Sequence, residues 1–129
     1  MALELDRYPE MGYEVDPPVP ADPVEMRQLR KWEVAIGYRI FSAMRWGQLG
    51  DGHISARDPE RSDHFWVLAH GIPFWAATVD NLSLVGPDGS VVEGHFGGGI
   101  NYAAHNIHWP ILDARPDLVS AAHTHTAFG

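Results

Sequence analysis

The sequence predicts a layered α/β domain with a largely antiparallel sheet and a crossover helix before its last strand. Three observations predict this class: a long amphipathic helical pattern near the start, two hairpin signals in the middle, and a second helical pattern followed by an apolar segment at the end. The chain has 129 residues, of which 45% are hydrophobic. That is enough to build the core of one such domain.

The first helix is predicted to begin at Pro23 and to end near Gly47. Asp22 is a typical N-cap residue, proline suits the first helical position, and Glu25 places a carboxylate in the first turn. Apolar residues then recur at helical spacing, at Leu29, Trp32, Ile36, Ile40 and Met44.

Two antiparallel hairpins are predicted next. The first pairs residues 52–57 with residues 64–69 across a polar turn, and the second pairs residues 82–85 with residues 90–93 across the turn sequence Gly-Pro-Asp-Gly.

A second helix and a final strand complete the predicted order. Asn101 can cap this helix, Pro110 disturbs its middle, and the sequence Arg115-Pro116 ends it. The apolar segment 118–125 is then predicted to be a buried or half-buried strand.

The composition excludes several classes of function. The chain carries 17 acidic and 9 basic residues, a net charge of −8 and a single lysine, so we expect neither nucleic acid nor an anionic membrane as a partner. It has no cysteine, which removes disulfides, thiolate ligands and a cysteine nucleophile. No apolar run approaches about 18 residues and no signal peptide is recognisable, so a cytoplasmic location is expected.

The N-terminal residues 1–22 are predicted to form an extended acidic arm ahead of a domain that spans residues 23–129. The first 25 residues hold seven acidic side chains and one basic one, and prolines crowd residues 17–23. The same composition is typical of a solvated tail without a task of its own.

Histidine carries the chemical signal, because all eight histidines lie between His53 and His125. On a strand, His123 and His125 would present their rings on one face, with Thr124 facing away, and would supply two ligands of a metal site. Alternatively, these two residues are ordinary surface or core histidines that form hydrogen bonds and bind no metal.

Further polar residues could complete this site. His105 and His108 lie three apart on the predicted second helix, where they could orient the metal ligands or simply pack. The sequences Gly52-His53-Ile54-Ser55 and His70-Gly71-Ile72-Pro73 could hold a carboxylate or phosphate at strand ends, although structural turns explain them equally well.

Five motifs in this order resemble the N-terminal part of the class II aldolase and adducin-like family. They are Gly52–Arg57, His70–Pro73, His108, Ala114–Asp117 and Ala122–His125, within a similarity that covers about residues 25 to 129.

The resemblance implies a three-layer α/β/α sandwich with a mostly antiparallel central sheet, commonly assembled as a homo-tetramer. It implies that His123 and His125 bind a divalent metal, with zinc expected first and manganese or iron as alternatives. A third histidine ligand would come from a strand further along the chain. The sequence is therefore expected to be a truncated form of the domain and to be inactive in isolation.

Two departures from the family pattern affect the expected mechanism. Sugar-phosphate aldolases of the family carry an acid/base glutamate at the position of Ala104, and their phosphate site matches Gly-Asn-x-Ser and Thr-Gly rather than the sequences around His53 and His70. The orienting or proton-transfer role then falls to His108.

The function expected of the full-length protein is that of a metal-dependent carbon-carbon lyase, acting by aldol cleavage or decarboxylation through a metal-stabilised enolate. Its substrate would be a hydroxy or keto acid, or a molecule similar to a sugar phosphate. The pocket would be lined by His53, Ser55, His70 and Gly71. The alternative is a non-catalytic, adducin-like interaction domain, which the loss of the glutamate favours.

Overall fold

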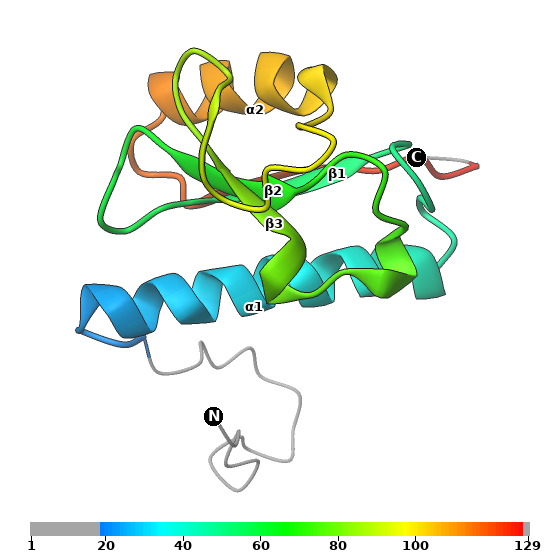
Figure 1. Ribbon diagram of the computed structural model, residues 1–129, viewed down its shortest axis with the longest axis horizontal. Coiled ribbons are helices and arrows are strands. Elements are labelled where there is room, and N and C mark those ends of the chain that lie inside the picture. Colours follow the sequence, from blue (N-terminus) through cyan, green and yellow to red (C-terminus); the bar gives the residue numbers. More distant parts are fainter. Residues whose placement is uncertain (1–18, 128–129) are drawn as a thin grey trace, which may run out of the picture.

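A five-stranded antiparallel sheet with a helix on each face forms the centre of the molecule, as the computed structural model shows for residues 19–127 (Figure 1). The strand order is β4-β3-β2-β1-β5. In chain order the elements are α1 (Pro23–Ala43), β1 (His53–Arg57), β2 (Phe65–Leu68), the short 3-10 helices η2 (Phe74–Ala76) and η3 (Val79–Asn81), β3 (Leu82–Val85), β4 (Val91–Gly94), α2 (Tyr102–Ala114) and β5 (Ser120–His123). The three-layer arrangement expected from the sequence is confirmed.

Helix α1 begins as its sequence predicts. The carboxylate of Asp22 accepts hydrogen bonds from the backbone N–H groups of Val24 and Glu25 at 2.8 and 3.0 Å. The helix ends at Ala43, earlier than the predicted end near Gly47, because Arg45 adopts a positive φ of 60° that breaks the helical path. Its inner face buries four side chains against the sheet, those of Val34, Ala35, Tyr38 and Phe41.

Both predicted hairpins are present. β1 pairs antiparallel with β2, and β3 pairs antiparallel with β4. All residues of β2 and β3 are buried, because the two helical layers cover both faces of the sheet here. Most of the apolar core comes from these two strands and from the helix faces that lie on them.

Helix α2 feeds the last strand, which pairs antiparallel with β1 at the edge of the sheet. Asn101 caps this helix through its side-chain oxygen, as predicted. The strand itself is shorter than the predicted segment 118–125, and it ends at His123. The backbone N–H of His125 donates to the carbonyl of Trp46 at 2.8 Å, so the chain leaves β1 at this point.

The guanidinium of Arg57 forms hydrogen bonds with several segments that follow β1. Arg57, the last residue of β1, donates to four backbone carbonyls that lie after β1 in the chain. The acceptors are the carbonyl oxygens of Ser62, Leu112, Arg115 and Leu118.

A buried carboxylate organises the turn between β1 and β2. Asp58 is 0% exposed and accepts hydrogen bonds from the guanidinium of Arg27 on α1 and from the indole N–H of Trp66 on β2. The backbone N–H groups of Glu60 and Arg61 also donate to it. These partners lower the pKa of Asp58 despite its burial, so the carboxylate stays charged.

The predicted acidic arm at residues 1–22 lies outside the described residues except for its last four, so it stays a prediction. Within residues 19–127, no helix is both long and apolar enough to cross a membrane.

Candidate metal and substrate site

His123 and His125 lie side by side at the end of β5, although only His123 belongs to the strand. Their Nε2 atoms are 2.9 Å apart, and the two ring planes are nearly perpendicular at 88°. His123 is half-buried and His125 is exposed, so the pair is accessible from outside.

The donor atoms of this pair fit a divalent cation. Two nitrogens that each bind one tetrahedral zinc at about 2.0–2.1 Å lie roughly 3.3 Å apart, and the observed 2.9 Å needs only a small spreading of the rings. Within residues 19–127, no cluster of three or more histidine, aspartate or glutamate side chains is arranged to hold a metal ion. This part of the chain therefore offers two ligands, and the third ligand expected further along the chain stays a prediction.

Behind the pair lies a buried network of two histidines and a serine. His53 Nδ1 is 2.7 Å from His108 Nε2, and His108 Nδ1 is hydrogen bonded to Ser55 Oγ. His108 and Ser55 are fully buried, and His53 is 3% exposed. Three residues that the sequence separates by up to 55 positions thus meet between β1 and α2.

Burial keeps both imidazoles of this network neutral at physiological pH. Burial, with smaller contributions from the neighbouring His123 and His125, lowers the pKa of His53 to about 4. Burial likewise lowers the pKa of His108 to about 3, with smaller contributions from His53 and His123. Both ring nitrogens of His108 are hydrogen bonded inside the protein, and this side chain does not line the cleft.

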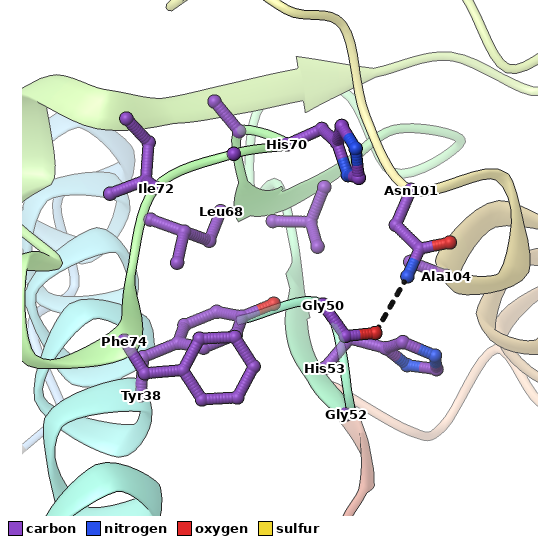
Figure 2. Close-up of a pocket in the computed structure, with 13 residues that line it drawn as sticks. Tyr38, Gly50, Gly52, His53, Leu68, His70, Ile72, Phe74, Asn101 and Ala104 are labelled. Carbon is purple, nitrogen blue, oxygen red and sulfur yellow. Dashed lines mark hydrogen bonds between the residues drawn. The ribbon is translucent and has the colours of Figure 1, made fainter. Parts of the chain in front are cut away.

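A small cleft opens beside His53, with a volume of about 20 Å³, which is room for roughly one water molecule. Figure 2 shows its walls, which include the polar side chains of His53, His70 and Asn101, and Gly71 also lines it. Asn101 donates to the carbonyl of Gly50 at 3.2 Å, which links the start of α2 to the loop before β1. The structure thus brings three of the four predicted pocket residues to one cleft, whereas Ser55 lies behind His53 and does not line it.

Ala104 lies on the wall of the same cleft, at the position where the resemblance placed a glutamate in sugar-phosphate aldolases. It is 0% exposed. A glutamate side chain at this position would have to extend into the cleft or displace the side chains around it.

His105 does not join the site, although the sequence places it on the same face of α2 as His108. Its Nε2 lies 2.9 Å from the carbonyl oxygen of Pro87, and its ring stacks over Phe65. The predicted alternative, a packing role, describes this residue.

Two cleft residues carried no functional signal in the sequence analysis. Asn101 was expected only as a helix cap, but its Nδ2 atom points toward the carbonyl of Gly50 in the loop before β1. Tyr38 accepts a hydrogen bond from the backbone N–H of Ile54 at 3.1 Å, and burial raises its pKa. An aromatic residue on the inner face of an amphipathic helix gives no sequence signal that separates such a role from core packing.

The fold of this chain is that of a known protein family. The chain belongs to the class II aldolase and adducin N-terminal domain family, whose model matches residues 33–129.

Three relatives illustrate the range of this family. Decarboxylase NovR from Streptomyces niveus is 36% identical over 100% of this chain and 48% of its own length. The structure of L-fuculose 1-phosphate aldolase from Glaciozyma antarctica PI12 superposes with a TM-score of 0.82 at 35% identity, over 88% of this chain and 46% of the aldolase. Alpha-adducin from Rattus norvegicus is 31% identical over 79% of this chain and 14% of its own length. The chain spans about half the length of the decarboxylase and the aldolase that it matches.

Proposed function

We propose that the full-length protein is a divalent-metal-dependent carbon-carbon lyase, which acts by aldol cleavage or decarboxylation on a hydroxy or keto acid or a substrate similar to a sugar phosphate. The observation that carries this proposal is the convergence of His123 Nε2 and His125 Nε2 at 2.9 Å beside a cleft that His53 lines. Similarity to a decarboxylase and to an aldolase supports the same class of reaction.

Each group has a role in this proposal. His123 and His125 would hold the cation, with zinc proposed first and manganese or iron as alternatives. When bound, the cation would stabilise negative charge on a substrate oxygen. His53, His70 and Gly71 would bind the substrate, and the buried His108 would orient His53 together with Ser55.

Decarboxylation is the form of the reaction that the site favours. The buried Ala104 offers no carboxylate for the proton transfers of an aldol reaction. The release of CO₂ from a panel of keto acids, compared with the release of an aldehyde from sugar phosphates, distinguishes the two reactions.

Metal analysis of the full-length protein tests the proposal. The wild-type protein should contain a stoichiometric divalent metal, and both His123→Ala and His125→Ala should lose it. His64→Ala is the matched control, since His64 pairs with Asp63 at 2.7 Å and belongs to a different turn. Unchanged metal stoichiometry in His123→Ala would refute the proposed site.

The second candidate function is a non-catalytic, adducin-like interaction domain. The similarity to alpha-adducin and the alanine at position 104 favour it. A full-length protein without bound metal, and without turnover in the substrate panel, would support this candidate. For either function we propose a cytoplasmic homo-tetramer, which light scattering and cell fractionation test.

A further inference from the structure

We propose that Ser55 and His108 are positioning residues that hold His53 in the tautomer with its proton on Nε2, so that His53 offers an N–H donor to an anionic oxygen of the substrate. The hydrogen-bond order within the buried network points to this arrangement. The part that concerns the substrate rests on the proposed function, whereas the tautomer does not.

Both imidazoles of this network are uncharged, because no oppositely charged group is hydrogen bonded to them to balance a positive charge. Among the described residues, the only hydrogen-bond partners within it are the two imidazoles and the hydroxyl, and no carboxylate contacts any of them through a hydrogen bond. An imidazolium enclosed with such partners would be a buried, unpaired charge, which is costly. Each ring therefore carries one proton, on one of its two nitrogens.

The hydroxyl of Ser55 decides the direction of the first hydrogen bond. Its only partner among residues 19–127 is His108 Nδ1. If the hydroxyl accepted a proton from Nδ1, its own proton would have no acceptor in a position that is 0% exposed. A buried donor left unpaired costs about 1–3 kcal/mol. The hydroxyl therefore donates, Nδ1 of His108 accepts, and His108 carries its proton on Nε2.

The second hydrogen bond follows from the first. The Nε2–H of His108 donates to Nδ1 of His53 across 2.7 Å, so the proton of His53 lies on its own Nε2. This nitrogen has no hydrogen-bond partner among the described residues. No side-chain nitrogen or oxygen that is fully enclosed there lacks a partner, so Nε2 of His53 must reach open space, and His53 lines the cleft.

The direction of the outer N–H determines what His53 can recognise. A neutral imidazole whose accessible nitrogen is Nε2–H donates a hydrogen bond, and it can neither bind a cation nor accept a proton through that nitrogen. A carboxylate or phosphate oxygen is the complementary group. His53 is thereby separated in role from His123, whose Nε2 faces His125.

Long-range proton–nitrogen NMR spectra of the histidine-labelled full-length protein near neutral pH test the tautomer. Protonated and unprotonated ring nitrogens differ widely in chemical shift, so the four nitrogens of His53 and His108 can be classified once assigned. We expect an unprotonated Nδ1 and a protonated Nε2 in both rings. A proton on Nδ1 of His53 would overturn the proposal.

Two serine variants test the positioning role. Ser55→Ala should let His108 populate both tautomers and should mix the two tautomers of His53, whereas Ser55→Thr should restore the wild-type pattern. Ser83→Ala is the matched control, because Ser83 is equally buried in β3 but donates to the backbone carbonyl of His95 instead of an imidazole. An unchanged His53 tautomer in Ser55→Ala would refute the role, and the wild-type spectrum decides the tautomer even if that variant fails to fold.

Titration with pyruvate and with inorganic phosphate tests the substrate part of the proposal. Either probe should shift the Nε2 signal of His53, and the probe with the larger effect identifies carboxylate or phosphate as the preferred group. No shift with either probe would remove the substrate role. The spectra need neither metal nor turnover. If the protein binds no metal but His53 has its proton on Nε2, the lyase proposal is refuted and the tautomer proposal stands.

Discussion

His53 of β1 and His123 of β5 are register partners in neighbouring antiparallel strands, and their rings stack with centroids 5.0 Å apart. This contact joins the buried His53–His108–Ser55 network to the accessible pair formed with His125. A positive charge on the pair would disfavour a proton on His53, since like charges at short range lower the pKa of a base. A cation bound by His123 and His125, as proposed, would therefore keep His53 neutral.

The stability of the metal-free protein should fall as the pH falls from about 6.5 to about 4. The folded-state pKa values of His53 and His108 are about 4 and about 3, below the ordinary value of 6.5. The unfolded chain therefore binds protons in this range that the folded chain does not, so the stabilisation present above pH 6.5 is lost on acidification.

Chemical denaturation across this pH range, with a chelator present, measures the effect. The slope should approach two protons per molecule, and the double variant His53→Gln/His108→Gln should lose most of it. An equal pH dependence in wild type and double variant would contradict the assignment of these protons.

Gly52→Ala should weaken metal binding by about tenfold or more, the range seen when residues that orient metal ligands are changed. Gly52 has a φ of +135°, and a Cβ added there would lie 2.9 Å from the carbonyl oxygen of His123. The end of β5 must then move. Gly50→Ala is the control, because this residue also has a positive φ but no atom lies within 4 Å of its added Cβ. Zinc titration calorimetry compares the two, and equal affinities would contradict the prediction.

Asp58→Ala should lower the free energy of unfolding by about 1–3 kcal/mol, the cost of leaving a buried hydrogen-bond donor unpaired. The substitution leaves the indole N–H of Trp66 without its acceptor. Arg27, in contrast, keeps its pairs with Glu60 at 3.0 Å and Glu93 at 3.5 Å. Asp117→Ala, which breaks the exposed pair with Arg115, should leave stability nearly unchanged. Urea denaturation measures both, and a comparable loss in the two variants would show that burial is not the cause.

Ala104→Glu should destabilise the fold by about 1–3 kcal/mol, because it adds a larger and charged side chain at a position that is 0% exposed on the wall of the cleft. Ala103→Glu, one residue earlier and exposed on the same helix, should fold normally. Thermal denaturation separates the two variants. A stable Ala104→Glu protein would mean that the cleft can open to accept a carboxylate.

Local signals in the sequence predicted most of the fold. The cap at Asp22 and the turn at residues 86–89 act over a few residues, so they can be read without knowledge of the rest of the chain. The early end of α1 and of β5 could not be read in this way. Both depend on tertiary or unusual backbone geometry, such as the hydrogen bond from His125 to Trp46.

The candidate site, too, could be predicted from the sequence only in part. The His123-x-His125 spacing predicted that the two rings lie together, because residues two apart on a strand share a face. The rings do meet, although the strand ends at His123 and His125 lies beyond it. The network around His108 does not follow from spacing, since Ser55 and His53 reach it across a strand-to-helix contact. Only the packing of α2 on β1 places these groups together, and the same packing turns His105 toward Pro87.

Within residues 19–127, Arg57 donates hydrogen bonds to four backbone carbonyls, from the turn after β1 to the segment that leads into β5. Every residue type presents the same carbonyl, so these four contacts do not depend on which side chains stand at residues 62, 112, 115 and 118. They depend on one side chain alone, that of Arg57.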